Sequence, residues 1–459
     1  MENKEKNIIV FVNSLPSSAV EAVRKLEKIK EKKYQILVLR DSRVKNKPEI
    51  LGSDIILDCD FSKPSSIASA LLPHQSQLAA ITCRSESNIA RFVAVIPHVP
   101  YLRTPSTESL VWATDKYEMR KRLRLFDAKN TPRFTLVKSN TKEERLRVSQ
   151  KVGFPLIVKP TSLAASALVS ICYHEEEFEK TLRSSFRKLR STYKKAKRVE
   201  NPQLMAEEYM EGKMYSVDSY VTSRGTITHC PLVYVTTGKS IGHDDFYNYI
   251  RMTPVQLKKE SIVAALSKVE NGIKALGLRS TSTHTELLNV DGDWKIIEIG
   301  PRIGGFRHVL HKLSCDIDHS LNDLLVRFPI KTIIPKTCKG FAAVMRYYSP
   351  EEGLIEQISG IKKIQELSSY DEISIKAKVG DRTYFSKNGG KGIFDLTLYN
   401  TERAKLLADI RRVEQMVEVK VATRGNNISK NNDKKMVVKK KTVKKKVGES
   451  KSKIVAKKK

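Results

Sequence analysis

Two glutamates between residues 283 and 305 have the types and the spacing that could hold a divalent metal ion. Glu286 and Glu298 lie in two runs of alternating apolar residues on either side of an Asp-Gly pair, a pattern that predicts a β-hairpin. If the turn takes three residues, 291 to 293, the two glutamates lie directly opposite each other, with β-carbons about 5 Å apart. Like charges at that spacing destabilise a sheet unless a cation lies between them, and Mg²⁺ prefers such oxygen ligands.

The register of the hairpin decides this prediction. A strict two-residue turn would place the glutamates on opposite faces, and an acidic hairpin exposed to solvent is the alternative to a metal site. The loop that follows favours a bound ligand, because its glycines let the backbone approach one closely. That loop contains Gly300, Pro301, Gly304 and Gly305. It also carries Arg302, whose planar fork grips a carboxylate or phosphate at two points. His284 is expected to be a half-buried strand residue.

The first segment, residues 1–112, alternates apolar strands with an amphipathic helix, which predicts a parallel sheet. Strands are expected at 8–13, 34–41, 54–60, 78–84 and 91–97, and a helix at 19–31. The sequence after the first strand, NSLPSSA, is not the Gly-rich loop of a dinucleotide site. A cofactor role is therefore not expected for this segment.

The second segment, residues 113–332, would place two lysines at the ends of regular elements. A helix capped by Thr114 or Asp115 carries Lys116, and a short apolar strand ends with Lys159. The further elements expected are a strand at 131–137, a helix at 141–154 that ends near Gly153, a basic helix at 183–198 and a strand at 204–210. A solvated face is the favoured interpretation of the basic helix, and anion binding is the alternative.

The third segment, residues 333–422, is predicted to be a small α/β unit. Strands are expected at 340–348, 360–364, 372–379 and 392–399, followed by a helix at 401–418. The remaining residues, 423–459, are rich in lysine and nearly free of large apolar side chains. Such a composition cannot bury a core, so this tail is predicted to be disordered.

The composition is that of a globular protein of several domains with a basic balance. The chain has 459 residues, of which 40% are hydrophobic, and a formal charge of +32. No apolar run is long enough to cross a bilayer and no cleavable signal begins the chain, so the prediction is a cytoplasmic protein without membrane contact. The six cysteines are scattered singly, and neither a zinc site nor a disulfide framework is expected. The tail could make non-specific contact with polyanions.

The hairpin, with HTE on one strand and EIGPRIGG on the other, resembles the metal site of ATP-grasp enzymes, in the branch that joins carboxylates to amino acids. Three more motifs occur in the same order as in that family. Lys116 in TDKYEMR and Lys159 in PLIVKP resemble its two nucleotide-contacting lysines. The run LMAEEYM resembles the hinge that holds adenine. The resemblance covers about residues 1–420 and implies a parallel-sheet domain ahead of a two-lobed ATP-grasp fold, with its lid at about 155–222.

The resemblance also implies roles for individual residues. Glu286 and Glu298 would bind Mg²⁺, with Mn²⁺ as an alternative, and Arg302 would be catalytic by steadying the carboxylate or its acyl phosphate. Residues implied to contact ATP are Lys116, Lys159, Ser162, Ser166, Glu207 as the acceptor from the adenine amine, and the backbone of Glu208 and Met210. The chain departs from the family in three places: the lid TSLAASALVS has no glycine, Met214 replaces a ribose-binding glutamate, and Gly300 replaces an asparagine ligand.

The activity implied by the resemblance is ATP-dependent ligation. ATP would phosphorylate a small carboxylate, and an amine, in this branch an amino acid, would then attack the acyl phosphate to give an amide, ADP and phosphate. The loop at 236–254, with His243 and Asp244, is a hypothetical lining of the acceptor pocket, and an ordinary surface loop is the alternative. Two other classes stay open: a non-catalytic ATP-binding scaffold, and a nucleic-acid-associated protein that acts through its basic tail.

Overall fold

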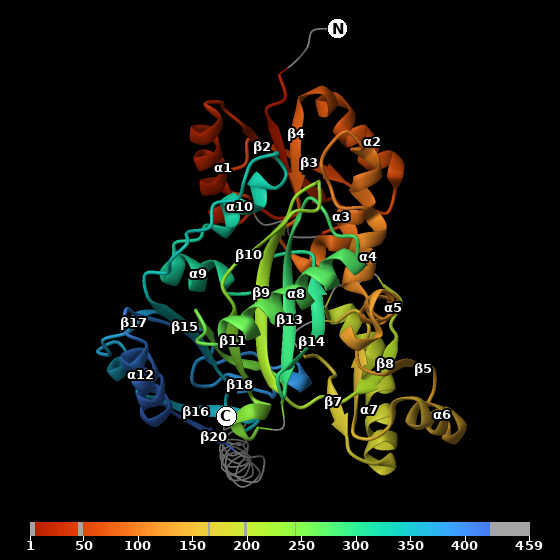
Figure 1. Ribbon diagram of the computed structural model, residues 1–459, viewed down its shortest axis with the longest axis vertical. Helices are drawn as coiled ribbons and strands as arrows, with labels where there is room; N and C mark the ends of the chain where they lie inside the picture. The colour runs from red at the N-terminus through yellow and green to blue at the C-terminus, as the bar shows by residue number, and fades with distance from the viewer. Residues whose placement is uncertain (1–4, 45–48, 164–165, 197–199, 244, 423–459) are drawn as a thin grey trace, which may run out of the picture.

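The computed structural model describes residues 5–44, 49–163, 166–196, 200–243 and 245–422, and Figure 1 shows how they are arranged. The predictions made for Asp244 and for the Lys-rich tail at 423–459 lie outside the described residues. Within the described part of the chain, no helix is both long enough and apolar enough to cross a membrane. Parallel and antiparallel sheets are combined with helices, which confirms the predicted α/β (α+β) class.

The amino-terminal part is a four-stranded parallel sheet with the strand order β3-β2-β1-β4, as predicted. Apolar cores cover both of its faces, which explains why its strands are continuous apolar runs. The strands are β1 (Ile8–Val12), β2 (Gln35–Asp41), β3 (Ile55–Cys59) and β4 (Leu78–Thr82). The helices are α1 (Ser17–Lys30), α2 (Pro64–Leu71), α3 (Ile89–Val95) and α4 (Thr107–Thr114).

The strand predicted at 91–97 is wrong, because this segment belongs to helix α3 and the 3₁₀ turn after it. Ile89, Phe92 and Val95 are buried and recur every three residues, so they line one side of a helix. A short apolar run does not separate a buried strand from a buried helix by its periodicity alone. Here the segment is not a fifth strand at the edge of the sheet. It is a helix whose buried side chains pack on one face of the four-stranded sheet.

Residues 134–208, called the lid region below, form a four-stranded antiparallel sheet with two helices, reached through helix α5 (Lys116–Phe126). The lid at about 155–222 stays a prediction, and its last part, β9 (Lys213–Val221), belongs to the central sheet. Its strands are β5 (Phe134–Val137), β6 (Leu156–Pro160), β7 (Ser170–Cys172) and β8 (Leu204–Glu208), and its helices are α6 (Lys142–Val152) and α7 (Glu175–Lys195). Asp115 caps α5 by accepting from the backbone N–H groups of Tyr117 and Glu118. The arginines and lysines between residues 183 and 195 of α7 are exposed, which confirms the solvated face.

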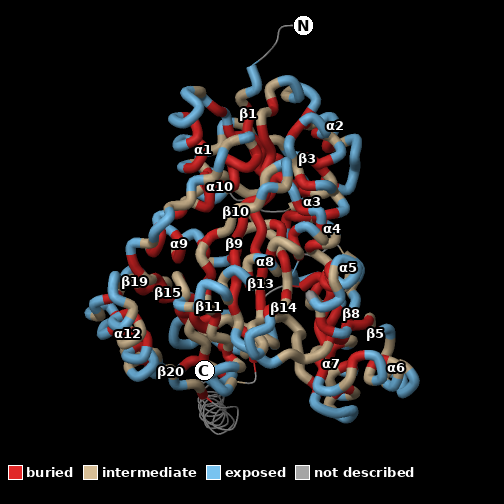
Figure 2. The backbone as a smooth tube through the Cα atoms, in the orientation of Figure 1, coloured by how far each residue is buried: buried red, intermediate tan, exposed pale blue. Residues whose placement is uncertain are grey.

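The centre of the molecule is a nine-stranded sheet with the order β14-β13-β9-β11-β12-β15-β19-β17, in which β10 also pairs with β9. Figure 2 shows that the long strands β9 and β13 are largely buried. The strands are β9 (Lys213–Val221), β10 (Ile227–His229), β11 (Val233–Thr237), β12 (Asn248–Thr253), β13 (Thr281–Val290), β14 (Asp293–Gly300), β15 (Phe341–Tyr347), β17 (Tyr370–Ile375) and β19 (Phe394–Asn400). Helices α8 (Lys259–Ala275) and α9 (Arg307–Cys315) pack against it.

The third segment does not build a main sheet of its own, because β15, β19 and β17 extend the central sheet through β12. A small sheet of β16 (Gly353–Ser359), β18 (Arg382–Thr383) and β20 (Glu418–Ala422) lies beside them with helix α12 (Arg403–Met416). The strand predicted at 360–364 is wrong, since the segment is the helical turn α11 (Ile361–Ile364). Gly360, at φ 87°, takes a left-handed conformation that starts this turn.

Helix α10 (His319–Leu325) follows α9 in the sequence but packs on the amino-terminal sheet, beside α1 in Figure 1. Leu321, Leu324 and Leu325 share an apolar core with the face of that sheet. Asp318, which caps α10, also pairs with Lys25 of α1 at 2.6 Å. The amino-terminal layer is therefore fastened to the segment that follows the hairpin.

Candidate active site

The hairpin β13-β14 places Glu286 directly opposite Glu298, as predicted, but by a different route. The turn has two residues, Asp291 at φ 49° and Gly292 at φ 95°, which is the mirror-image turn that suits a hairpin. The predicted three-residue turn is wrong. A β-bulge restores the pairing, because Leu287 pairs with Ile296 and the next pair is Glu286 with Glu298.

Arg120 of α5 holds the bulge, and no sequence motif indicated this role. Its guanidinium donates at 2.9 Å to the carbonyl of Ile296 and to that of Ile297, the residue that the bulge leaves without a partner in the pairing register. It also donates at 3.0 Å to Glu207 of the lid, and its side chain is only 1% exposed. One buried cation therefore joins the lid strand β8 to the strand that carries Glu298.

The side chains of Glu286 and Glu298 are 24% and 27% exposed, so both carboxylates can be reached by a ligand. The Nζ atom of Lys116 lies 3.1 Å from Glu298 and donates at 2.7 Å to the Leu163 carbonyl. Burial opposes the charge of this ammonium, but Glu298 and the nearby Glu86 outweigh it, so the pKa of Lys116 is raised. The lysine is a cation beside the two carboxylates.

A buried polar row supports Glu286 from the neighbouring strand. His284 lies between Asp218 of β9, at 3.2 Å, and Glu286, at 3.7 Å. Burial alone would lower the pKa of His284, but Asp218 raises it above its ordinary value. The expectation of a half-buried histidine is wrong, since His284 is buried. Gly304 is required here, because a β-carbon on it would lie 2.4 Å from the ring of His284.

Lys159 and Glu207 form a buried ion pair at the inner end of the lid sheet. Burial lowers the pKa of Lys159 to about 8 against the attraction of Glu207, with Arg120 adding to the effect. Burial would raise the pKa of Glu207, but Arg120 and Lys159 hold it at about 2. Both oxygens of Glu207 are engaged by cations, so its geometry here is that of a positioning group and not of a free acceptor for an adenine amine.

The residues of the predicted hinge lie at the end of β8 and directly after it. The N–H of Glu208 donates to the Arg133 carbonyl at 2.9 Å, and its carboxylate pairs with the Arg133 guanidinium at 3.1 Å. Met210 is half-buried in the turn between β8 and β9. Met214, at the place of the expected ribose contact, lies in β9 opposite Leu288 of β13 and Val235 of β11.

The two lid serines are positioned by the elements around them. Ser162 is buried, and its N–H donates at 3.2 Å to the hydroxyl of Tyr193 on α7. Ser166 has φ 57°, and its hydroxyl donates at 3.2 Å to the Phe246 carbonyl. Helix α7 therefore holds Ser162, and the loop at 236–254 holds Ser166.

Arg302 lies in the loop after β14 and forms an ion pair with Glu86, in a 3₁₀ turn of the amino-terminal domain. Burial opposes the charge of Arg302, but Glu86 raises the pKa of the guanidinium. Arg302 was predicted from its motif, whereas Glu86 lies in a segment without one. The amino-terminal domain thus contributes a carboxylate to the neighbourhood of Glu286 and Glu298, both of which also act on Arg302 electrostatically.

The two hairpin glutamates fit a hard divalent cation by donor chemistry. They offer oxygen ligands from opposed positions, are partly exposed, and lie beside Lys116 and Arg302, which suit phosphate oxygens. A glutamate pair in this position is destabilising on its own. Glu286 and Glu298 are therefore the residues that would hold Mg²⁺.

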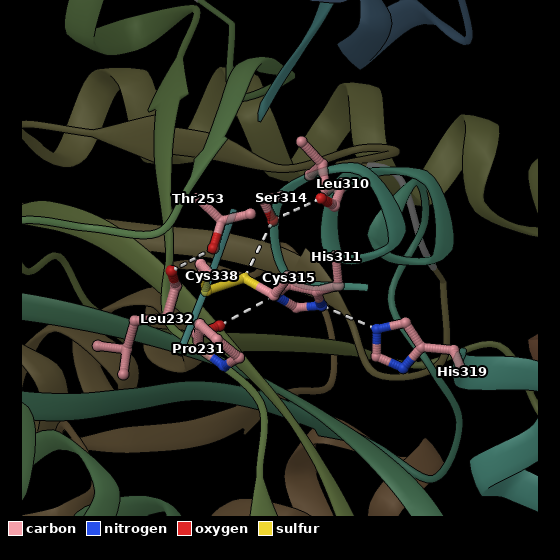
Figure 3. Close-up of a disulfide and its surroundings, with 9 residues drawn as sticks. All are labelled: Pro231, Leu232, Thr253, Leu310, His311, Ser314, Cys315, His319 and Cys338. Atoms are coloured by element: carbon pink, nitrogen blue, oxygen red, sulfur yellow. Dashed lines mark hydrogen bonds between the residues drawn. A yellow bond between two sulfur atoms is a disulfide. The ribbon is translucent and has the colours of Figure 1, made fainter. Parts of the chain in front are cut away.

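One cysteine and two histidines, from a β-strand connection and helices α9 and α10, form a buried cluster although their spacing in the sequence is not that of metal ligands. The ligand atoms of Cys230, His311 and His319 lie within 4.8 Å of one another. A hydrogen-bond chain already accounts for both rings: His311 contacts the Pro231 carbonyl at 3.0 Å and His319 at 2.8 Å, as Figure 3 shows, and His319 contacts Tyr220 at 2.5 Å. Burial lowers the pKa of His311 to about 4 and that of His319 to about 3, so both are neutral.

Figure 3 also shows a disulfide between Cys315 and Cys338, with α-carbons 3.9 Å apart. The expectation that the cysteines are unpaired is wrong for these two. Cys315 ends α9 and Cys338 lies just before β15, and the 22 residues between them show no pairing signal because the contact depends on the fold. The bridge fastens the far end of the helix that starts with Arg307.

Comparison with known proteins finds similarity over part of the sequence and over most of the fold. Residues 152–309 match the family model of the ATP-grasp domain. The chain is 27% identical over 241 residues to an alanine–anticapsin ligase of Bacillus amyloliquefaciens, which covers 50% of this chain and 49% of that protein. It is 24% identical over 261 residues to a D-alanine–D-alanine ligase of Fervidobacterium nodosum, covering 52% of this chain and 74% of that protein.

Among solved structures, the fold resembles that of an L-amino acid ligase from Bacillus licheniformis. The TM-score is 0.69 at 16% identity, covering 92% of this chain and all of that one. The matched region thus spans about half the length of the alanine–anticapsin ligase, whereas the fold is shared over nearly the whole chain. The predicted fold is therefore confirmed.

Proposed function

We infer that the protein, whose residues 152–309 match the ATP-grasp domain model, is an ATP- and Mg²⁺-dependent ligase that joins a carboxylate to an amine and releases ADP and phosphate. The observation that carries this inference is the pairing of Glu286 with Glu298 beside Lys116 and Arg302. The ligases named among its relatives support an amino acid as one substrate. The cytoplasm stays a prediction from the sequence.

The proposed reaction needs positioning and charge neutralisation more than covalent help from the protein. Lys116 and Lys159 bind the phosphates of ATP as ammonium groups, with Arg120 and Glu207 holding Lys159 in place. Mg²⁺ held by Glu286 and Glu298 would neutralise charge on the phosphates. Arg302 steadies the carboxylate as it becomes an acyl phosphate, because its fork matches either group.

The neutral amine then attacks the acyl carbon, the bond from that carbon to the phosphate oxygen breaks, and phosphate leaves with the bonding electrons while the nitrogen loses a proton to the departing phosphate or to water. Asp218 and His284 act through Glu286, since His284 is held by Asp218 and contacts that glutamate. They are positioning residues. Ser162 and Ser166 keep the lid against α7 and against the loop at 236–254. Met210 and the backbone of Glu208 are the proposed adenine contacts.

ADP and phosphate release by the full chain tests the proposed function. Purified protein would be given ATP and Mg²⁺ with pools of amino acids, and with pools of amino acids plus small carboxylic acids. We expect at least one pool to stimulate both products in equal amounts, together with a new amide detected by mass spectrometry. ATP binding without ADP formation in any pool would contradict a ligase and favour a non-catalytic ATP-binding scaffold.

A further inference from the structure

Arg251 is a buried cation on the face of the central sheet that carries the candidate site. It is only 8% exposed, and its guanidinium donates at 3.1 Å to the Asn248 carbonyl. Among the described residues, no carboxylate lies within ion-pair distance of it. By contrast, Arg346, two positions along on the adjacent strand, is held by Asp395 through two hydrogen bonds of 2.6 and 3.0 Å.

The register of the sheet places Arg251 on the same face as the hairpin glutamates. Ser216 of β9 pairs with Glu286, and Met214, two residues before Ser216, pairs with Val235 of β11. Val235 in turn pairs with Arg251 of β12. Paired residues share a face and so do residues two apart, so the face continues from the glutamates to Arg251. Three strand spacings separate them, roughly 14 Å between backbones, and the long arginine side chain shortens that distance.

The surroundings of Arg251 raise the free energy of its charge. Its guanidinium lies 5.2 Å from the ring centre of Phe306, and that of Arg346 lies 4.7 Å from the same ring. Burial, with Arg307 and Arg346 nearby, lowers the pKa of Arg251 to about 9. One aromatic face is a weak partner for two cations, and a desolvated charge without a counter-ion is costly.

The backbone that supports this arrangement is itself strained. Phe306 has φ 63°, a left-handed conformation that is rare for an aromatic residue, at the start of α9. The next residue, Arg307, donates at 2.6 Å to the hydroxyl of Ser216, the residue of β9 that pairs with Glu286. This contact connects the start of α9 to the strand position beside the proposed metal ligand. Strain of this kind, and cations without partners, both concentrate where proteins bind ligands.

We propose that Arg251, with Arg346 beside it, binds a second anionic group of the acid or amine substrate, a carboxylate or a phosphate. The statement that the bound anion belongs to a substrate rests on the proposed function, whereas the anion-binding subsite itself does not. A guanidinium fork matches either oxyanion at two points, and an incoming anion would supply the missing counter-charge. The substrate class is then one with an anionic group several bonds away from the carboxylate or amine that reacts.

Calorimetric binding to the full chain, with a non-hydrolysable ATP analogue and Mg²⁺ present, tests the subsite directly. The probes are L-glutamate against L-glutamine, and O-phospho-L-serine against L-serine, so that each pair differs mainly in charge. We expect the anionic member of at least one pair to bind roughly tenfold to a hundredfold more tightly. The pair with the larger difference identifies the oxyanion as carboxylate or phosphate.

Variants then assign the difference to this residue. Arg251→Met should abolish the discrimination, and Arg251→Lys should keep part of it, because the charge stays and the fork is lost. Arg183→Met, on the exposed face of α7, is the matched control and should leave the discrimination unchanged. Thermal unfolding with the ATP analogue checks that each variant is folded.

Equal binding of the charged and neutral members by the natural chain would overturn the inference, whether or not the variants fold. Discrimination that survives in Arg251→Met would overturn it as well. If no pool stimulates ADP release while the binding difference persists, the proposed ligase fails and the subsite stands. If ADP release is stimulated but charged and neutral probes bind alike, the proposed ligase stands and the subsite fails.

Discussion

The two ends of one sheet face differ in how their buried charges are balanced. At the hairpin end, Lys116 is paired with Glu298, and Arg120 with Glu207. At the β12 end, Arg251 has a backbone carbonyl and a shared aromatic ring, and no carboxylate among the described residues. At the hairpin end, both of these cations have a carboxylate partner before any ligand binds, whereas at the β12 end a ligand would supply one.

This difference separates the parts of the site by what they must do. A balanced network keeps its geometry in the free protein, which suits the binding of ATP, a ligand of constant shape. An unbalanced cation favours whichever substrate brings the opposite charge, and so it sets specificity. Substitutions at the hairpin end should therefore reduce the rate with every substrate, and those at the other end should change the choice among substrates.

The largest effect is expected for Glu298→Gln. Removing this charge from the proposed metal site should lower ADP formation by roughly 10³-fold, because stabilisation of the transferred phosphoryl group depends on the metal. The rate of ADP release at saturating ATP measures it. The matched control is Asp293→Asn in the same hairpin, where an exposed carboxylate pairs with Lys295. Undiminished ADP release in Glu298→Gln would refute the metal assignment, and the hairpin end would then have no special role in the rate.

The next effect is expected for Arg120→Met, which breaks the buried network between the lid and the hairpin. Leaving Glu207 buried without this partner should lower the free energy of unfolding by about 3–5 kcal/mol. Urea denaturation monitored by fluorescence measures it. Arg133→Met, which removes the exposed pair with Glu208, should cost no more than about 1 kcal/mol. Equal losses in the two variants would show that the buried network is not what holds the lobes together.

A smaller effect is expected from pH, through Lys159. Its pKa is lowered to about 8, so it is an ammonium below that pH and loses its proton as the pH rises above it. The ratio kcat/KM for ATP should therefore fall above pH 8, by about tenfold for each further unit, since this ratio reports the free enzyme. Lys159→Arg keeps its charge and should remove the fall. A flat profile in the natural chain between pH 7.5 and 9.5 would contradict the role of Lys159.

The sequence predicted the hairpin end better than the β12 end for a physical reason. Glu286, Glu298 and Arg302 are close in sequence and obey the period of two along a strand, so their proximity follows from local rules. Even there, the bulge was not foreseen, because it depends on Arg120, more than 170 residues away. The predicted pairing of the two glutamates is therefore correct although the predicted three-residue turn is wrong.

The residues that were missed owe their roles to tertiary contacts. Glu86 reaches Arg302 from another domain, and Asp218 reaches His284 from a neighbouring strand. Asp218 did carry a signal, since it is a charged residue in an otherwise strand-like run, at even spacing from Ser216. The bridge between Cys315 and Cys338 had no signal, because pairing of scattered cysteines depends on the folded path of the chain.

The buried guanidinium of Arg120 also restricts how the lid can open. Any movement that drew β8 directly away from β14 would strip a desolvated cation of its carboxylate and its two carbonyls at once. A rotation that keeps this point fixed breaks none of them. Arg120 therefore acts as a pivot, and the outer parts of the lid, near α6 and α7, should travel furthest while Lys159 and Glu298 keep their separation.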